Sequence, residues 1–523
     1  MKREHQIKEL AIDQMWDVII IGGGASGLGA AVEAASRGYK TALFEAVDFA
    51  KGTSSRSTKL VHGGVRYLAQ GDVKMVSEAL EERGLLAVNA SHLFKNQTFV
   101  IPNYSRWANW YYGFGLKVYD YLSRRLSLGK SKMISKKEII RNLPTLKKEK
   151  LSGGVAYQDG QFDDARLAIN LAQTAIENGA LVVNYCKVNE LLKDEKGKIY
   201  GVQVVDMETN NTYQVHSKVV INATGVFSNK ILKLDGRKKS GLKVVPSQGV
   251  HIVLDASFLK SDKALMIPKT SDGRVLFAIP WHNKVVVGTT DTLIKKPSFE
   301  PKALDQEIEF ILRTTSQYLT KIPKKSDVLS VFAGLRPLVA PDGNKKNTKE
   351  ISRGHRILES ESGLLSILGG KWTTYRKMGE ELIDTAAEIH SLESKPSISR
   401  NLAIHGSIHF KNDELEEHLE VYGSDLPKLR TLSEQHVSYR EKIHPRYNFT
   451  VAEVVWAVRF EMARTVEDIL ARRVRLLFLD AQAAIEAAPL VAKVLARETK
   501  NDAAWAQKHE KAFVEVAQNY LLK

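Results

Sequence analysis

Residues 16–45 restrict the fold of this 523-residue chain more than any other stretch. An apolar run, WDVIII, is typical of a buried strand, and the glycine-rich GGGASG follows it directly. The helical LGAAVEAASRG and a second strand-like run, KTALFE, complete the stretch. This order predicts a strand–turn–helix–strand unit of an α/β sheet, which binds the phosphates of a dinucleotide at the helix N-terminus.

The glycines of this stretch have the G-x-G-x-x-G spacing of a dinucleotide-binding turn. Gly22 permits the tight turn, Gly24 lets the backbone approach a pyrophosphate, and Gly27 lets helix and strand pack closely. Glu45 ends the second strand, where it can accept hydrogen bonds from the adenosine ribose hydroxyls. The predicted cofactor contacts of this unit are Gly22, Gly24, Ala25, Ser26, Gly27 and Glu45.

Three later segments favour FAD over NAD as the dinucleotide. NYCKVNELL has the pattern of a strand, KVVINATGVFSN is a strand that ends in small residues, and LLSILGGKWTTYRKMGE repeats the strand, double-glycine and helix order. Each segment alone also fits a turn or strand end with no binding role, but together they favour a flavin held by separated segments. The predicted contacts here are Val188, Ala223, Thr224, Gly225, Gly370, Lys371 and Thr373.

Several motifs, in order, resemble those of the FAD-dependent glycerol-3-phosphate dehydrogenases, which belong to the D-amino-acid-oxidase-like flavoproteins. They are GGGASGLGAA, TSSRSTKLVHGGVRYL, INATGVFSN, DGRVLFAIPW, VVVGTTDT, AGLRPLV and GGKWTTYRKM. The resemblance runs from Trp16 to beyond Arg376 and resumes at 461–480, EMARTVEDILARRVRLLFLD. It implies oxidation of sn-glycerol 3-phosphate to dihydroxyacetone phosphate, with electrons passed from FAD to a membrane quinone.

The resemblance also implies an α/β fold of three parts. These are a Rossmann-like FAD-binding domain of the D-amino-acid-oxidase/glutathione-reductase type, an antiparallel-sheet substrate domain and a helical C-terminal domain. We expect FAD-binding segments at 1–100, 151–245 and 346–390, a basic aromatic insertion at 101–150, the substrate sheet at 246–345 and the helical domain at 400–523.

The segment 53–68, TSSRSTKLVHGGVRYL, acquires a chemical role under this resemblance. Alcohol oxidation needs a base near the hydroxyl, and His62 suits that role because imidazole titrates near neutrality. A histidine that only braces the loop is the alternative. The glycine pair after His62 is expected to let the loop pass close to the isoalloxazine. The hydroxyls expected to hydrogen-bond cofactor oxygens are those of Thr53, Ser54 and Ser55.

A phosphorylated substrate also needs cations, and arginine suits this because its planar fork grips phosphate oxygens in pairs. Arg336 lies between apolar residues in AGLRPLVAPDG, where an arginine needs an anion or carbonyl groups. Arg274 is either a further contact or a strand-edge charge. The resemblance places Arg66, Tyr67, Arg336, Arg353 and Lys371 around the substrate, although Arg353 also fits a solvated loop. The predicted catalytic residues are His62, Arg66 and Arg336.

Residues 101–150 hold twelve basic side chains against three acidic ones, a net +9 of the chain's +16. Aromatic and apolar residues recur there at helical spacing, and such a stripe is either core or a contact with an acidic membrane surface. The sequence has no nucleic-acid-binding module, so we expect no nucleic-acid partner. The stripe consists of Trp107, Trp110, Tyr111, Phe114, Val118 and Tyr121.

Other features set the remaining expectations. The single cysteine, Cys186, excludes an internal disulfide and suits a reducing cytosol. The charged start lacks the apolar core of a secretory signal, so we expect a cytoplasmic protein, peripheral on the inner face of the cell membrane. Histidines are scattered, which predicts no metal. Ion pairing on a helix face is expected for Glu461, Arg464, Asp468, Arg472 and Arg475.

Two other functions stay open. A glycerol-3-phosphate oxidase would share the first half-reaction and use dioxygen as its acceptor, because oxygen access depends on cavity shape. A non-catalytic flavin-binding interaction protein is the second, and the intact set of His62, Arg66, Arg336 and Lys371 argues against it. The sequence leaves a homodimer open.

Overall fold

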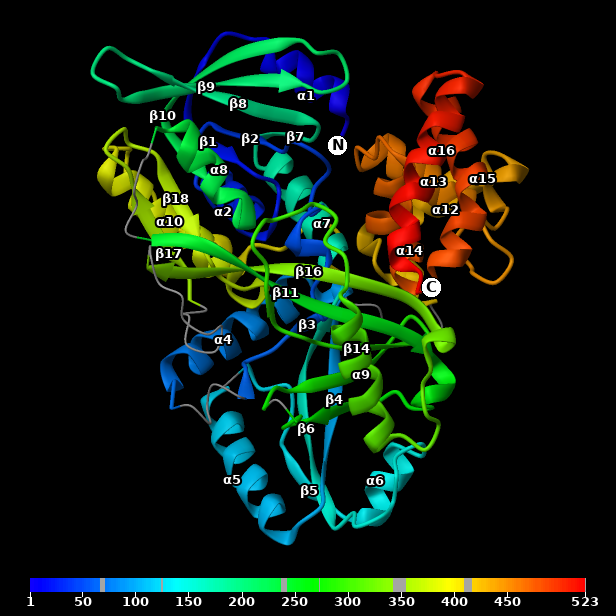
Figure 1. The fold of residues 1–523 in the computed structure, drawn as a ribbon. Coiled ribbons are helices and arrows are strands. Elements are labelled where there is room, and N and C mark those ends of the chain that lie inside the picture. The colour runs from blue at the N-terminus through cyan, green and yellow to red at the C-terminus, as the bar shows by residue number, and fades with distance from the viewer. Residues whose placement is uncertain are drawn as a thin grey trace.

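The computed structural model describes residues 1–65, 71–123, 126–236, 242–271, 273–341, 354–408 and 416–522. Figure 1 shows an upper sheet with the N-terminus, a lower sheet beneath it, and a group of C-terminal helices at one side. The predicted architecture is therefore confirmed: an α/β dinucleotide-binding part, a largely antiparallel sheet and a helical C-terminal domain.

The upper sheet has eight strands, six of them in the order β17-β18-β10-β1-β2-β7. β1 pairs in parallel with β2, because a helix makes the crossover between these two strands. β1 also pairs in parallel with β10. β8 and β9 continue from β10 as an antiparallel extension. The strands are β1 (Met15–Ile21), β2 (Thr41–Phe44), β7 (Leu181–Val183), β8 (Cys186–Lys193), β9 (Ile199–Asp206), β10 (Thr212–Asn222), β17 (Arg356–Glu359) and β18 (Leu365–Leu368).

Both faces of the upper sheet are covered, which explains the continuous apolar run of β1. On one face α2 packs against α7 and α10, and Val18 and Ile20 of β1 point into that layer. On the other face Ile19 and Ile21 pack against β8 and β9. The helices of this part are α1 (Arg3–Leu10), α2 (Ala25–Ser36), α7 (Asp164–Glu177), α8 (Ser228–Leu234) and α10 (Tyr375–Ile389).

The lower sheet has ten strands, eight of them in the order β15-β11-β14-β13-β12-β4-β6-β3. β16 pairs with β11 along almost its whole length, and β5 pairs with β6. The strands are β3 (Leu60–Val61), β4 (Phe94–Asn103), β5 (Lys132–Ile134), β6 (Gly153–Phe162), β11 (Leu242–Asp255), β12 (Ala264–Ile267), β13 (Leu276–Trp281), β14 (Lys284–Gly288), β15 (Thr292–Leu293) and β16 (Val328–Pro341). The helices beside it are α4 (Val73–Asn89), α5 (Arg106–Leu122), α6 (Lys136–Asn142) and α9 (Asp305–Tyr318).

The membership of this sheet differs from the expected boundaries in one respect. β3, β4 and β6 belong to the lower sheet, although the expected boundaries place β3, β6 and most of β4 in the FAD-binding segments 1–100 and 151–245. The reason is pairing across the chain: β4 and β6 pair over ten residues, and β3 adds to the edge of β6. The lower sheet therefore receives strands from both sides of the basic region.

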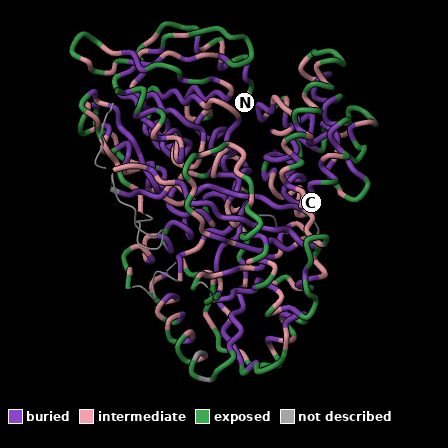
Figure 2. Tube along the Cα trace, in the orientation of Figure 1, coloured by how far each residue is buried: buried purple, intermediate pink, exposed green. Residues whose placement is uncertain are grey.

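The C-terminal helices share one hydrophobic core with the lower sheet, which contributes Val253, Trp281, Val286 and Phe332, and α14 and α15 pack against β16. They are α11 (Glu417–Glu420), α12 (Leu426–Glu434), α13 (Val451–Phe460), α14 (Leu476–Leu479), α15 (Ala481–Thr499) and α16 (Ala503–Ala517). Figure 2 shows that buried residues follow the strands of both sheets, whereas exposed residues gather at the loops and at the end that carries α5 and α6. Among the residues described, no helix is long and apolar enough to cross a membrane.

Candidate functional site

A large cavity of about 590 Å³ lies at the carboxyl end of β1, where the turn into α2 forms one wall. Gly22 in this turn has a φ of +113°, and a Cβ there would lie 2.8 Å from the carbonyl oxygen of Ala223. A Cβ at Gly27 would collide with the carbonyl oxygen of Gly22. These glycines let the turn place the backbone N–H groups at the start of α2 beside the cavity.

Glu45 follows β2 and lines the same cavity. Its Oε2 accepts a 2.6 Å hydrogen bond from the N–H of Gly23, and its Oε1 accepts a 3.0 Å bond from the N–H of Val47. Burial raises the pKa of this carboxyl above its ordinary value, while the two N–H groups act in the opposite direction. Each oxygen keeps a further lone pair, which can accept from a hydroxyl in the cavity.

The large cavity brings together most of the predicted cofactor contacts, from segments far apart in the sequence. It is lined by Gly22, Gly24, Ala25, Ser26, Glu45, Thr53, Ser54, Val188, Ala223, Thr224, Gly225, Gly370 and Lys371. Three predicted contacts lie behind its wall instead. Gly27 packs against the turn, Thr373 is buried in the short helix before α10, and the carbonyl of Ser55 accepts hydrogen bonds from Lys59 and Arg475.

Aromatic residues that the sequence did not single out complete this cavity. Phe227 and Phe299 line it with their ring centroids 4.3 Å apart, and Trp372 donates a 2.8 Å hydrogen bond from Nε1 to the carbonyl of Ser54. Trp372 lies inside the GGKWTTYRKM motif, so that motif was its only signal in the sequence. Phe299 lies in an irregular loop, where no pattern marks it.

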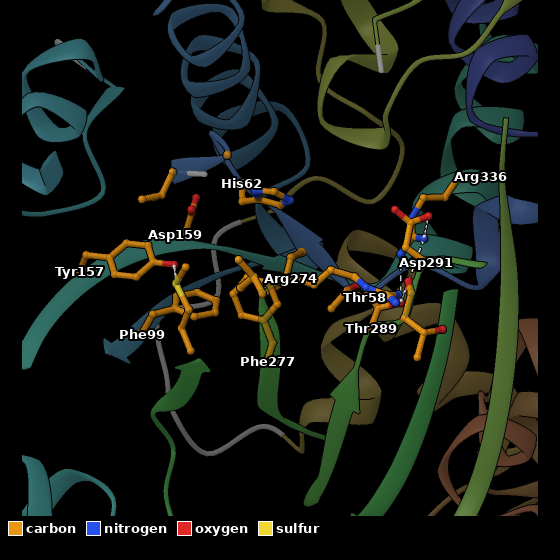
Figure 3. Close-up of a pocket in the computed structure, with 16 residues that line it drawn as sticks. Thr58, His62, Phe99, Tyr157, Asp159, Arg274, Phe277, Thr289, Asp291 and Arg336 are labelled. Atoms are coloured by element: carbon orange, nitrogen blue, oxygen red, sulfur yellow. Dashed lines mark hydrogen bonds and ion pairs between the residues drawn. The ribbon is translucent and has the colours of Figure 1, made fainter. Parts of the chain in front are cut away.

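A small cavity of about 180 Å³ lies on the other side of β16. Arg336 lines the small cavity and the next residue, Pro337, lines the large one, because consecutive strand residues point to opposite faces. Figure 3 shows His62, Arg274 and Arg336 around the small cavity, with Phe99 and Phe277 below His62. The wall is therefore mixed, with basic and hydroxyl groups beside apolar rings.

Arg336 is held in place by its neighbours at this cavity. Its Nη1 donates to the carbonyl of Thr290 and its Nη2 to the hydroxyl of Thr289, both at 3.0 Å. The carboxylate of Asp291 lies 3.6 Å from Nη1. The guanidinium thus has the carbonyl partner that the apolar surroundings of AGLRPLV predicted, and about 29% of its side chain stays accessible.

His62 reaches the small cavity because β3 adds to the edge of β6 immediately before it. Of the two glycines that follow His62, the first packs against neighbouring side chains and the second lines the cavity. A Cβ at Gly63 would lie 2.5 Å from a Leu80 methyl and 2.6 Å from the Tyr119 hydroxyl, whereas Gly64 has a φ of +76° and lines the small cavity. The absence of a side chain at Gly63 therefore permits packing, and the approach of the glycine pair to the isoalloxazine stays a prediction.

A second, buried histidine lies behind the small cavity. His251 Nε2 is 2.9 Å from the hydroxyl of Thr58, which lines the cavity, and the His251 ring stacks on Phe332 at 4.9 Å. Burial, together with the positive charges of Lys59 and Arg336, lowers the pKa of His251 well below its ordinary value. His251 is therefore neutral at physiological pH, and it orients Thr58.

Buried charged side chains hold segment 53–62 to α7 and to the C-terminal domain. Lys59 Nζ donates to Asp164 Oδ2 at 2.7 Å and to the carbonyl of Ser55 at 2.8 Å. Arg475 donates to the other oxygen of Asp164 at 2.9 Å and to the same carbonyl at 3.1 Å. Burial and the charge of Arg475 lower the pKa of Lys59 to about 7.

The charged residues of 461–480 thus differ from the expectation of pairing along one helix face. Asp468 and Arg472 do pair along the helix at 2.6 Å. Glu461 instead pairs with Arg166 at 2.7 Å, and Arg475 with Asp164, both across the boundary to α7. These side chains are buried, because the C-terminal helices cover them.

Other predicted residues are distributed as follows. Lys371 lines the large cavity and is absent from the lining of the small one, and Arg274 lines the small cavity with its guanidinium 5.5 Å from the centroid of the Phe310 ring. Arg66, Tyr67 and Arg353 lie outside the described residues. In the described part of the chain, no group of three or more His, Cys, Asp or Glu side chains could hold a metal.

Comparisons with known proteins agree with this arrangement. Residues 17–376 match the family model of FAD dependent oxidoreductases, and residues 363–506 match that of the C-terminal domain of alpha-glycerophosphate oxidase. A probable mitochondrial glycerol-3-phosphate dehydrogenase of Caenorhabditis elegans is 39% identical over 99% of this chain and 75% of its own. The mitochondrial glycerol-3-phosphate dehydrogenase of Saccharomyces cerevisiae is 36% identical, over 100% and 91%.

Solved structures extend the likeness to the fold. A glycerol-3-phosphate dehydrogenase from Bacillus halodurans, solved in complex with FAD, has a TM-score of 0.81 and 28% identity, over 99% of this chain and 98% of that one. An L-alpha-glycerophosphate oxidase from Mycoplasma pneumoniae with FAD bound shares the fold, with a TM-score of 0.58 and 16% identity over 75% and 98%. The likeness to the dehydrogenase therefore includes the C-terminal helices.

Proposed function

Because the chain belongs to the FAD-dependent glycerol-3-phosphate dehydrogenases, we propose that it oxidises sn-glycerol 3-phosphate to dihydroxyacetone phosphate and passes the electrons to a quinone. One observation carries the proposal. A nucleotide-sized cavity and a small cavity with basic and hydroxyl groups lie on opposite sides of one strand, β16. An alcohol with a phosphate group can then be held beside a redox cofactor.

The residues of the large cavity fit FAD. The start of α2 offers N–H groups to a pyrophosphate, and the Glu45 carboxylate offers free lone pairs to ribose hydroxyls. Gly369 and Gly370 have φ values of +81° and +99°, so their backbone turns without side chains at the cavity wall. Bound FAD supplies a two-electron acceptor for the alcohol.

The small cavity supplies the remaining groups. His62 accepts the hydroxyl proton of the substrate, since it is the imidazole that lines this cavity. Arg336 and Arg274 bind the phosphate, because both guanidinium groups belong to the same wall. The roles of Arg66, Tyr67 and Arg353 stay predictions.

We expect the Arg336→Ala variant to raise the KM for glycerol 3-phosphate about 10- to 150-fold, because a charge-assisted hydrogen bond contributes about 1.5–3 kcal/mol. Steady-state kinetics with a soluble quinone measures this. Arg313→Ala, which removes an exposed arginine of α9, is the matched control and leaves KM unchanged. A KM for Arg336→Ala equal to that of the wild type would remove Arg336 from the phosphate site.

The acceptor distinguishes a dehydrogenase from an oxidase. After anaerobic reduction by glycerol 3-phosphate, the flavin is offered dioxygen or a soluble quinone in separate stopped-flow experiments. We expect rapid reoxidation by the quinone and slow reoxidation by dioxygen. Faster reoxidation by dioxygen would instead support the oxidase.

A membrane quinone requires that the protein approach a bilayer, and α5 offers a surface for this. The side chains of Trp107, Trp110, Phe114 and Tyr121 are between 72% and 82% exposed, so the interpretation of the aromatic stripe as core is wrong for them. Figure 1 places α5 at the end of the molecule opposite β8 and β9. Exposed lysines follow on α5, in and just before β5, and at the start of α6, namely Lys117, Lys130, Lys132, Lys136 and Lys137.

We propose that this aromatic face docks on an acidic membrane surface, so that the protein is a peripheral membrane protein. The relatives from Caenorhabditis elegans and Saccharomyces cerevisiae are named mitochondrial, and the cytoplasmic location of this chain stays a prediction.

Vesicles test the docking surface directly. We expect the double variant Trp110→Ser/Phe114→Ser to lose at least tenfold in affinity for vesicles of phosphatidylglycerol and phosphatidylcholine, since burial of a large apolar side chain contributes about 1.5–3 kcal/mol. Co-sedimentation measures the affinity, which also falls as salt is added. Tyr200→Ser, which removes an exposed aromatic of β9, is the control. Equal binding by the double variant and the control would exclude α5 as the docking surface.

A further inference from the structure

Helix α5 has a second, buried face that reaches the loop of His62. Tyr119 on this face is 1% exposed. Its hydroxyl accepts a 2.8 Å hydrogen bond from the backbone N–H of Gly63, the residue after His62. The same hydroxyl donates a 2.7 Å bond to Oδ2 of Asp159 on β6. One oxygen atom therefore joins the His62 loop, α5 and the strand beside the small cavity.

The partners of Tyr119 are fixed as well. Asp159 lines the small cavity, and its Oδ1 lies 3.1 Å from Nη1 of Arg83 on α4. Asp159 and Arg83 are 2% and 1% exposed. Burial and the charge of Asp159 raise the pKa of Tyr119 well above its ordinary value. The phenol thus stays protonated. It donates its one O–H hydrogen bond to Asp159, and its oxygen accepts the hydrogen bond from the N–H of Gly63.

Packing around Gly63 leaves this arrangement little freedom. A Cβ at Gly63 would meet Leu80 and the Tyr119 oxygen, and the following Gly64 bends away with a positive φ. The N–H···O bond from Gly63 ties the backbone next to His62 to α5. Loss of that bond would leave a buried N–H without its acceptor.

We propose that Tyr119, held by Asp159 and Arg83, is a positioning residue for His62 in the oxidation of glycerol 3-phosphate. The proposal rests on the proposed function, because that function gives His62 its role as the base. The contacts of Tyr119 do not depend on that function. Tyr119 lines neither cavity, and it contacts the backbone of Gly63, the residue next to His62. A base displaced by about 1 Å can lose about 100-fold in rate.

The test compares Tyr119→Phe with Tyr112→Phe, a matched control on the same helix whose side chain lines neither cavity. Phenylalanine keeps the ring and removes only the oxygen. We expect Tyr119→Phe to slow flavin reduction about 10- to 100-fold while FAD content and the KM for glycerol 3-phosphate stay within twofold. Backbone hydrogen exchange in a peptide covering residues 60–65 should also accelerate in Tyr119→Phe and not in the control.

Each outcome bears on the proposal. An unchanged rate with unchanged exchange would overturn it, and so would a rate loss that matches lost FAD content or a lowered melting temperature. If Tyr119→Phe does not fold, Asp159→Asn provides the second variant, because the amide weakens the hold on Tyr119 without removing volume. Since Asp159 also lines the small cavity, this variant supports the proposal only if hydrogen exchange in residues 60–65 accelerates together with the loss of rate. Wild-type protein that glycerol 3-phosphate fails to reduce would contradict the proposed function, whereas the exchange measurement needs no substrate and still tests Tyr119.

Discussion

Replacement of His62 by glutamine should slow reduction of the bound flavin by glycerol 3-phosphate about 10²–10⁴-fold, while FAD stays bound. The reason is geometric and chemical. His62 lines the small cavity beside Arg274 and Arg336, and glutamine keeps a polar tip but cannot accept a proton near neutrality. Stopped-flow absorbance measures the rate. The wild-type rate should fall on the acid side, because only a neutral imidazole can accept the hydroxyl proton.

The control for this prediction is His216→Gln, since His216 stacks on Tyr200 at the sheet extension and lines neither cavity. It should reduce its flavin at the wild-type rate. A His62→Gln protein that also does so would leave His62 as a residue that braces its loop, and the base would have to be sought elsewhere.

Replacement of Asp164 by alanine should lower the free energy of unfolding by about 3–5 kcal/mol, because it removes the buried carboxylate that Lys59 and the guanidinium of Arg475 share. Lys59 and Arg475 donate to opposite oxygens of Asp164, and all three side chains are almost wholly buried. Thermal unfolding of the FAD-bound protein measures the effect, with an expected fall in the midpoint of about 5 °C or more.

The matched control for Asp164 is Asp384→Ala. Asp384 pairs with Arg37 at 2.6 Å, but its own side chain is 58% exposed, so its loss should cost at most about 1 kcal/mol. Equal midpoints for the two variants would show that the charges beneath segment 53–62 contribute no more than a surface pair. The claim that the C-terminal helices anchor this segment would then fail.

The large cavity was predictable because its chemistry is local. The glycines of GGGASG, the strand before them and the acid after β2 are all set by short-range backbone requirements. The later segments that close the cavity were found as further strand ends with small residues, at Ala223 and at Gly370. Thr373 is buried and does not line the cavity. A motif shows which residues are adjacent and not which side chains turn inward.

The small cavity and its support were much less predictable, because their contacts join distant residues. Tyr119 lies 56 residues from Gly63 and 40 from Asp159, and no pattern links the three. The face of α5 was ambiguous for a related reason. An aromatic stripe at helical spacing has the same period whether it meets a core or a bilayer, and the exposure of these side chains in the folded chain excludes the core for them.

A phosphorylated alcohol in the small cavity should reduce FAD in the large one. Anaerobic mixing of the purified holoprotein with glycerol 3-phosphate, followed through the flavin absorbance, tests it in a single turnover. We predict rapid and saturable bleaching by glycerol 3-phosphate and almost none by glycerol at the same concentrations. A flavin that stays oxidised with glycerol 3-phosphate, or that glycerol bleaches equally well, would contradict the account.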